Sequence, residues 1–233
     1  MKILALETSA KAASCAVLAD GVPVASAWQC TGLTHSRTLQ PMIADMLRNS
    51  EMSMAEMDAV AVAAGPGSFT GLRIGVAAVK GLAWAADKPC IPVSTLEAMA
   101  WPLAHLEGTV VCAMDARRQQ IYNAVFRAKD GVLERLREDR AISLEDAAGD
   151  LAGLDGALTV VGDGAELCFR FLAEKGLACQ MAPGHLRLQS AVGVGLAAWR
   201  RRDHAVSAQE LTPVYLRLSQ AERERMERER SAS

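Results

Sequence analysis

Residues 59–75 read AVAVAAGPGSFTGLRIG, and this stretch decides the fold class of the 233-residue chain. The unbroken apolar run at residues 59–64 predicts a strand that is buried on both faces. The glycines that follow predict a tight turn, and a helical pattern continues over residues 71–86. A buried strand, a glycine-rich turn and a helix in this order indicate an α/β fold.

The residues before this stretch predict a three-stranded meander and a helix. The strands are expected at residues 3–6, 14–18 and 22–28, and the Asp20-Gly21 pair between the last two is a strong hairpin signal. The helix that follows should carry Pro41 near its first turn. Its apolar stripe has a spacing that only a helix places on one face, and it consists of Leu39, Met42, Ile43, Met46 and Leu47.

The residues after the stretch predict the same order of elements a second time. A strand at residues 89–94 and a helix at 95–106 complete the first series. The second series has strands at residues 109–114, 120–127 and 132–140, a helix from residue 143, a strand at 158–161, a helix at 165–175 and a last helix at 188–202. This internal repeat of ~100 residues predicts two similar α/β lobes. The expected divisions are a lobe at residues 1–106, a lobe at 107–218 and a charged tail at 219–233.

Composition narrows the functional classes. The chain carries 25 Lys and Arg against 27 Asp and Glu, a net charge of −2. This balance excludes a strong positive field, so any contact with nucleic acid has to be local or shared with a partner. The six scattered cysteines predict small buried side chains in a reducing compartment, and no segment has the roughly 20 apolar residues of a membrane span. We therefore expect a cytoplasmic protein without membrane contact.

The glycine-rich stretch at residues 65–75 allows two interpretations. Glycines at a strand-to-helix turn let unpaired N–H groups point at one spot, which suits a phosphate or a carboxylate. The other interpretation is structural, with Gly71, Gly75 and Gly81 letting the helix pack tightly against a neighbour. The stretch is neither a Walker A motif nor a GxGxxG fingerprint.

Acidic residues follow the first strand of each half. Glu7 comes after residues 3–6, and Asp115 holds the equivalent place after residues 109–114. In a nucleotide-dependent two-lobed fold such carboxylates hold Mg²⁺, although strand ends are also commonly polar for solvation alone. The candidate contacts for a nucleotide or phosphate are Glu7, Thr8, Ser9, Asp115, Gly162, Asp163 and Gly164. The four histidines lack the spacing of a zinc or iron site, so we expect no metal centre.

Three motifs together resemble those of the TsaB (YeaZ) family. They are LETS at residues 6–9, GPGSFTGLRIG at residues 65–75 and DARRQQIY at residues 115–122. The resemblance extends to about Leu216, and the second motif is its most specific part. It implies a pair of RNase-H-like lobes of the actin/sugar-kinase/Hsp70 (ASKHA) superfamily.

The same resemblance implies a function. TsaB-like proteins take part in the bacterial synthesis of N6-threonylcarbamoyladenosine (t6A) at position 37 of tRNA. They are the non-catalytic partner of TsaD, which transfers the threonylcarbamoyl group, and TsaE is an accessory ATPase of the system. On this basis we expect a scaffold that activates a TsaD-like enzyme, works with a TsaE-like ATPase, reaches tRNA through the complex and needs no cofactor.

The chain departs from the catalytic paralogue at one helix start. The paralogue has His-Leu-Glu-Gly-His there, and the two histidines bind metal. The matching stretch here reads TLEAM at residues 95–99, so Thr95 and Met99 stand where the histidines would be. A hydroxyl and a thioether cannot replace two imidazoles as metal ligands. Metal-dependent transfer should therefore be absent from this chain.

The helix at residues 71–86 is apolar nearly all round, so one face should bury against something other than its own sheet. With the helix at residues 39–47 it predicts half of a four-helix interface, formed with a second copy or with the TsaD-like partner. The alternative is that all of these side chains are internal core. The candidate interface residues are Leu39, Met42, Ile43, Met46, Leu47, Leu72, Arg73, Val76, Val79 and Trp84. Arg73, a cation in the first turn of a helix, should be offset by a carboxylate or phosphate.

Two functional classes stay open from the residues alone. One is an interaction protein, the scaffold described above. The other is an enzyme, either a nucleotide-dependent phosphotransferase or a glycoprotease-like peptidase, and the missing base and metal ligands argue against both. The tail, with ERERMERER at residues 222–230, is interpreted as a solvated terminal helix, and an arm that contacts a partner is the alternative.

Overall fold

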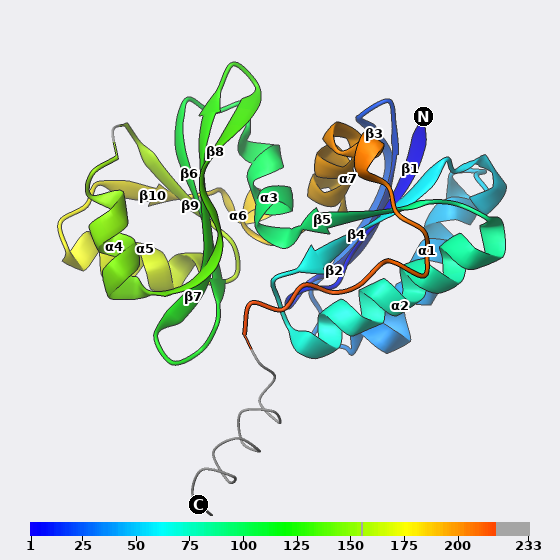
Figure 1. Ribbon diagram of the computed structural model, residues 1–233, viewed down its shortest axis with the longest axis horizontal. Helices are drawn as coiled ribbons and strands as arrows, with labels where there is room; N and C mark the ends of the chain where they lie inside the picture. The colour runs from blue at the N-terminus through cyan, green and yellow to red at the C-terminus, as the bar shows by residue number, and fades with distance from the viewer. Residues whose placement is uncertain (155, 218–233) are drawn as a thin grey trace, which may run out of the picture.

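The computed structural model describes residues 1–154 and 156–217, and the tail predicted at residues 219–233 lies outside them. Two lobes lie side by side, each built on a five-stranded sheet (Figure 1). The strands of the first sheet are β1 (Lys2–Glu7), β2 (Ala13–Ala19), β3 (Val22–Gln29), β4 (Ala59–Gly65) and β5 (Cys90–Ser94). Those of the second are β6 (Gly108–Asp115), β7 (Gln120–Lys129), β8 (Val132–Ser143), β9 (Leu158–Val161) and β10 (Cys179–Met181).

The two sheets share one topology. The strand order is β3-β2-β1-β4-β5 in the first sheet and β8-β7-β6-β9-β10 in the second. In each sheet the first three strands along the chain pair antiparallel, and the last two join by parallel pairing. The predicted internal repeat and the two-lobed α/β fold are therefore confirmed.

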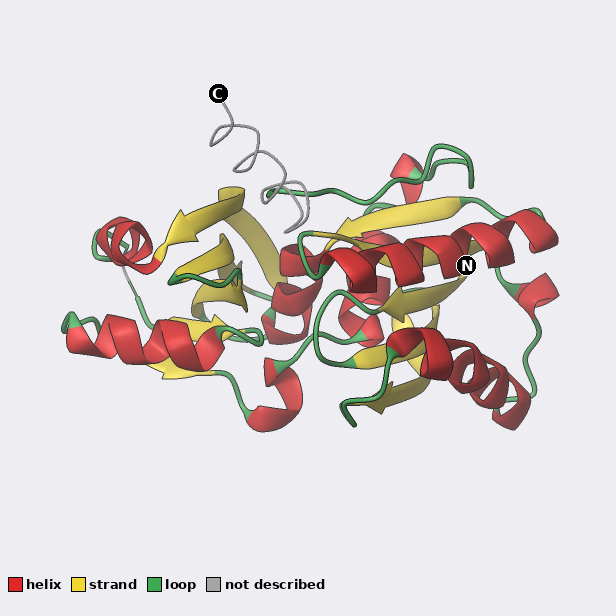
Figure 2. Cartoon of the chain, turned by 90° about the horizontal axis from the view of Figure 1, so that it is seen from below, coloured by secondary structure: helices red, strands yellow, loops and turns green. Residues whose placement is uncertain are grey.

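Helices cover both faces of each sheet, as the second view in Figure 2 also shows. They are α1 (His35–Asn49), α2 (Phe69–Ala86), α3 (Thr95–Ala100), α4 (Leu144–Leu151), α5 (Ala165–Glu174), α6 (Gly184–Arg187) and α7 (Ala191–Arg200). On the first sheet, α1 and α2 pack on one face and α7 on the other. On the second sheet, α4 and α5 pack on one face and α3 on the other. No helix among the described residues is long and apolar enough to cross a membrane.

Alternate side chains of β1 explain why both faces of the first sheet need a cover. Leu4 and Leu6 pack with α1 and α2, whereas Ile3 and Ala5 pack with α7, and all four are fully buried. Successive side chains of a strand point to opposite faces of the sheet. A strand that is covered on both faces therefore needs an unbroken run of apolar residues. The same holds for β4, which confirms the expectation for residues 59–64.

The Asp20-Gly21 and Asp130-Gly131 pairs close two-residue hairpin loops. Asp20 and Gly21 have φ angles of 49° and 79°, and Asp130 and Gly131 have φ angles of 53° and 73°. A type I′ turn needs two successive residues in this left-handed region, which glycine adopts freely and aspartate tolerates. The hairpins between β2 and β3 and between β7 and β8 thus follow from local sequence.

Helix ends differ from the sequence prediction where capping decides them. α2 begins two residues earlier than expected, because the Ser68 side chain accepts a hydrogen bond from Gly71 N at 3.3 Å and caps the helix. α1 begins at His35, so Pro41 is its seventh residue, and the first-turn position expected for this proline is wrong. The helix expected at 95–106 ends as α3 at Ala100, since Pro102 has no N–H to continue it and a short 3₁₀ turn follows.

Two cysteines do not match the expectation of burial. Cys15, Cys90, Cys112 and Cys168 are buried, but Cys30 is exposed, and Cys179, in the unpredicted short strand β10, is half-buried. All six have free thiols.

The lobes exchange helices relative to chain order. α7 comes late in the chain but packs on the first sheet, and α3 comes early but packs on the second. α3 and α7 also contact each other, so the lobes meet through them. A boundary between residues 106 and 107 therefore separates the strands of the two sheets, but it does not separate the helices that pack on them. That residues 1–106 and 107–218 are separate domains stays a prediction.

Candidate functional site

A cleft of about 460 Å³ opens between the two lobes. Its walls come from the ends of β1 and β6, the start of α2 and a C-terminal strap, which we define as residues 205–217. Three of the candidate residues named from the sequence border this cleft, namely Ser9, Asp115 and Asp163. The structure thus brings together groups that are far apart in the chain, as expected where corresponding strand ends of two lobes face each other.

The residues Glu7, Thr8 and Ser9 form the floor of the first lobe and are fully buried. Glu7 Oε1 accepts a hydrogen bond from Ser9 N at 2.5 Å, and Glu7 Oε2 has no partner among the described residues. Burial raises the pKa of Glu7 to about 7. Thr8 Oγ1 donates to Gly71 O at 2.8 Å, which ties β1 to the start of α2. Glu7 and Thr8 therefore support the cleft from below.

The turn after β9 is the matching floor of the second lobe. A Cβ on Gly162 would lie 2.1 Å from Ala113 O, and one on Gly164 would lie 2.7 Å from Asp115 N, so both positions require glycine for this close approach. Asp163 Oδ1 accepts a hydrogen bond from Gln189 Nε2 at 2.9 Å, and burial raises the pKa of Asp163. Both glycines are buried. Of the candidate residues in the second lobe, Asp115 and Asp163 are the ones whose side chains line the cleft.

The glycine-rich stretch has a structural role at two of the three positions proposed. A Cβ on Gly71 would lie 2.1 Å from Thr8 O, and one on Gly75 would lie 2.4 Å from Thr8 Oγ1. A Cβ on Gly81 would meet no atom within 4 Å, so no close contact among the described residues requires glycine there. A phosphate contact of this turn stays a prediction.

The C-terminal strap crosses the mouth of the cleft and joins the two lobes. Val214 N donates to Ala64 O at 2.7 Å at the end of β4, and Arg217 Nη1 donates to Ala116 O at 2.5 Å in the second lobe. In Figure 1 this segment runs beside α2 and ends in the space between the lobes. The strap thereby limits how far the lobes can separate without breaking these bonds.

Arg73 has partners other than the expected carboxylate or phosphate. Its Nε donates to the Tyr215 hydroxyl at 3.1 Å, and its guanidinium lies 3.9 Å from the centre of the Phe69 ring. The ring of Phe69 stacks in turn on Tyr215, with the ring centres 4.7 Å apart. The charge of Arg73 is thus offset by a cation–π contact and a hydroxyl oxygen.

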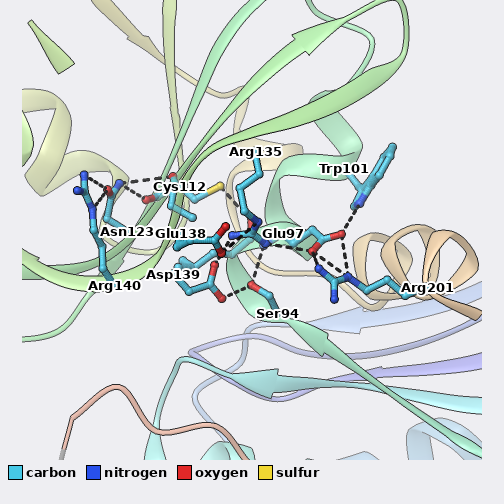
Figure 3. Close-up of polar contacts among 12 residues, drawn as sticks. Ser94, Glu97, Trp101, Cys112, Asn123, Arg135, Glu138, Asp139, Arg140 and Arg201 are labelled. Atoms are coloured by element: carbon cyan, nitrogen blue, oxygen red, sulfur yellow. Dashed lines mark hydrogen bonds and ion pairs between the residues drawn. The ribbon is translucent and has the colours of Figure 1, made fainter. Parts of the chain in front are cut away.

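A second connection between the lobes is a network of ion pairs around Glu97 (Figure 3). Glu97 Oε2 accepts from Arg201 Nη2 at 2.6 Å, beyond the end of α7, and from Arg135 Nη2 at 3.0 Å on β8. Asp139 also binds Arg135 and accepts from the Ser94 hydroxyl. Burial alone would raise the pKa of Glu97, but the hydrogen bonds and charges of the two arginines outweigh it and lower that pKa.

Comparison with known proteins identifies the family. A Bacillus subtilis protein named "tRNA threonylcarbamoyladenosine biosynthesis protein TsaB" is 32% identical over 222 residues, which are 95% of this chain and 96% of the relative. The chain belongs to the TsaB family. A family model described as "TsaD: tRNA N6-adenosine threonylcarbamoyltransferase" matches residues 29–224, so this member of the TsaB family is also similar to TsaD.

Solved structures agree with this assignment and with the fold. The structure titled "YeaZ from Pseudomonas aeruginosa" superimposes with a TM-score of 0.79 at 28% identity, covering 92% of this chain and 99% of that chain. Component A of (R)-2-hydroxyglutaryl-CoA dehydratase from Acidaminococcus fermentans has a TM-score of 0.51 at 15% identity, over 87% of this chain and 99% of that one, a likeness of fold alone. The two lobes of this TsaB-family chain therefore have the ASKHA fold implied by the sequence motifs.

In this TsaB-family chain, Thr95 and Met99 are interior residues of α3. Thr95 is 0% exposed and Met99 is 3% exposed, and Met99 packs in the core of the second lobe. Among the residues that the structure describes, no group of three or more His, Cys, Asp or Glu side chains could hold a metal ion. Neither side chain is available to act in place of an imidazole.

Most of the interface residues expected from the sequence lie inside the protein. Six of them are buried in the core between α1, α2 and the first sheet, and Leu72 is also fully buried, so these seven do not lie on an open surface: Leu39, Ile43, Met46, Leu47, Val76, Val79 and Leu72. Met42 is half-buried, whereas Arg73 and Trp84 are exposed. Sequence could not separate these positions, because a helix that is apolar all round does not reveal which face meets the sheet. The interface itself stays a prediction.

Several residues that line the cleft were not predicted from the sequence. Lys11, Phe69, Tyr215 and Arg217 line it together with Tyr122. Phe69 and Tyr122 belong to the motifs at residues 65–75 and 115–122, but neither was singled out. The strap has neither helical nor strand periodicity, so nothing local indicated where it would run. Only the packed structure brings Tyr215 to the start of α2.

Proposed function

We propose that the chain is the non-catalytic partner of a TsaD-type enzyme and that it supports the formation of threonylcarbamoyladenosine in tRNA. The proposal is supported by the name and the near-complete coverage of the TsaB relative. It is also supported by the match to the TsaD family model, because related chains commonly associate through corresponding surfaces. On this proposal the protein works in the cytoplasm, together with a TsaE-like ATPase.

The non-catalytic part of the proposal rests on α3. A metal-dependent transfer needs ligands that hold a cation in an accessible place. Thr95 and Met99 are buried and offer a hydroxyl and a thioether. The partner would then supply the metal and the transfer chemistry, and this chain would supply a surface.

The observation that carries the proposal is the outer α2 face, which we define as the exposed uncharged residues Ala77, Gly81, Trp84 and Ala85. Trp84 is 68% exposed, an unusual state for so large an apolar side chain. A helix that meets only solvent carries charged side chains on that side, whereas only two of the 18 residues of α2 are charged. Tryptophan amid small residues is typical of a protein interface. A second copy of the chain would occupy the same face when the partner is absent.

The test is a reconstituted modification assay with tRNA, threonine, bicarbonate, ATP and the partner proteins. Omitting the chain should abolish most of the modified nucleoside. Ala77→Arg should do the same, because it places a charge in the interface at an exposed position and leaves the core intact. The matched control is Ala173→Arg, which changes an exposed alanine of α5 in the other lobe. Full modification without the chain would refute the proposal.

The second candidate function is a nucleotide-dependent or glycoprotease-like enzyme. The observation in its favour is the cleft between the lobes, with Asp115 and Asp163 on its wall. Assays of ATP hydrolysis and peptide cleavage by the purified chain alone distinguish the two candidates. Turnover by the isolated chain that is lost in Asp163→Asn would favour the enzyme.

A further inference from the structure

Both tyrosines of the chain line the same cleft. The sequence has two tyrosines, Tyr122 on β7 and Tyr215 on the C-terminal strap, and both border the space between the lobes. Tyr215 is 38% exposed, and its ring is held by stacking on Phe69. An aromatic ring that is fixed from behind and open in front is a platform for an unpaired nucleobase.

Cations gather on the rim of this cleft. Lys11, Arg117 and Arg217 border it, and Arg118 is exposed next to Arg117. The Arg117 side chain is 86% exposed, and its distance of 3.9 Å to Asp115 leaves most of its hydrogen-bonding capacity free. A chain with a net charge of −2 thus presents a local group of cations, which is one of the two forms of nucleic-acid contact, local or shared with a partner, that its composition permits.

The backbone that displays the two arginines is strained. Arg117, Arg118 and Gln119 have φ angles of 66°, 55° and 55°, three successive non-glycine residues in the left-handed region. Each costs roughly 1–3 kcal/mol in general, and such residues concentrate at ligand-binding places. Hydrogen bonds hold the turn in this shape, from Arg117 N to Asp115 Oδ1 at 2.7 Å and from Leu144 N to Gln119 O at 3.2 Å. The turn keeps both arginine side chains at the rim.

The charges of rim and floor differ in sign. Lys11 and Arg117 are exposed at the rim together with one carboxylate, Asp115, which is 3.9 Å from Arg117. Asp163 is half-buried and Glu7 is fully buried beneath them. A polyphosphate deep in the cleft would meet these two acidic groups. A phosphodiester chain that runs along the rim would meet the cations. The arrangement therefore favours a polymer at the rim over a free nucleotide at the floor.

We infer that the rim of the cleft binds an unpaired segment of RNA. Its bases stack on Tyr122 and Tyr215, and its phosphates pair with the cations of the rim, Lys11, Arg117, Arg118 and Arg217. The choice of RNA rests on the proposed function, whose substrate is a tRNA, and the combination of a basic groove with aromatic platforms is the chemistry that single-stranded nucleic acids require.

The test measures binding of the full-length chain, without partners, to a fluorescent RNA hairpin with an unpaired loop and to a fully paired RNA duplex of the same length. The chain should bind the hairpin more tightly than the duplex. In the double variant Arg117→Ala/Arg118→Ala the slope of log affinity against log salt should become shallower by about 0.7 for each phosphate that these arginines no longer neutralise. The matched control is Arg48→Ala/Arg170→Ala, which removes two exposed arginines of α1 and α5 and should leave the slope unchanged.

Stacking has a separate readout. Tyr215→Leu should weaken hairpin binding about fivefold or more and leave the salt slope unchanged, because it removes a platform and no charge. Ultraviolet crosslinking of a hairpin with 4-thiouridine in its loop should label the peptide that contains Tyr122 or Tyr215 in the unmodified chain, which avoids dependence on any variant.

Three results would overturn the inference. They are equal affinity for hairpin and duplex, an unchanged salt slope in the double arginine variant, and displacement of the hairpin by ATP at an equal concentration of phosphate groups. The last result would assign the rim to free nucleotides. Binding is measured without partners, so a negative result there does not refute the proposed function, which the reconstituted assay tests separately. If the double arginine variant still stimulates modification in that assay, only the inferred RNA contact is refuted.

Discussion

Glu97 and Arg201 are joined by three hydrogen bonds across 104 residues of sequence, with Arg201 Nε 3.2 and 3.1 Å from the two carboxylate oxygens and Arg201 Nη2 2.6 Å from Oε2. Glu97 lies on α3, which packs on the second sheet, and Arg201 follows α7, which packs on the first. The pair therefore fixes one lobe against the other at the side of the molecule where α3 and α7 meet.

Glu97→Gln should destabilise the protein by about 2 kcal/mol at pH 7, because it removes the carboxylate charge that Arg201 and Arg135 share. Arg201 is partly exposed, so the effect is smaller than for a fully buried pair. The pKa of Glu97 is lower in the folded protein than in the unfolded chain. Its stabilisation is therefore complete above the unfolded pKa of roughly 4.3 and is lost as pH falls through the folded pKa. Urea unfolding at neutral and acid pH measures the effect, and a gap between variant and wild type that persists in acid would contradict it.

Gly71→Ala and Gly81→Ala should have opposite effects although both glycines lie in α2. The first places a Cβ 2.1 Å from Thr8 O, so backbone must move, and we expect a loss of about 3 kcal/mol or more. The second meets open space and gains about 0.5–1 kcal/mol from helix propensity. Thermal unfolding of the two variants provides the comparison, and destabilisation by Gly81→Ala would mean that this face is already covered.

Glu7→Gln should remove a pH dependence of stability. The pKa of Glu7 is about 7 in the folded protein and about 4.3 in an unfolded chain, so the folded state binds more protons between these values. Stability then falls as pH rises through this window, by up to about 4 kcal/mol. The free energy of unfolding of wild type, measured relative to the variant, should decrease from pH 5 to pH 8. A constant difference across that range would show that Glu7 stays ionised.

Val79→Glu should unfold the protein, whereas Trp84→Ala should leave its thermal unfolding nearly unchanged and weaken partner binding. Val79 is fully buried between α2 and the first sheet, and an unpaired charge there costs several kcal/mol. Trp84 is exposed, and truncation of such an anchor commonly costs about 2 kcal/mol or more of binding. Circular dichroism and gel filtration with and without the TsaD-type partner separate the two effects. A folded Val79→Glu chain would contradict the core placement.

The elements that could be predicted were those with local causes. The two Asp-Gly hairpins followed from the backbone freedom of these residues, and β4 and β9 followed from unbroken apolar runs. Helix starts were less accurate, since Ser68 caps α2 through a contact that spacing alone does not reveal. The residues that form the floor of the cleft in each lobe were predicted from their place at the ends of strands. Their burial was not predicted.

By itself, the sequence determined that the chain has two lobes with one repeated topology, and its motifs determined the family. Periodicity and turn chemistry act between near neighbours, so they survive without knowledge of the fold. Only the tertiary structure decided that Val79 faces inward, that α7 returns to the first sheet, and that Tyr122 and Tyr215 share a cleft. Each of these depends on how apolar faces from distant segments pack together, and an apolar face can bury against many partners until the whole chain selects one.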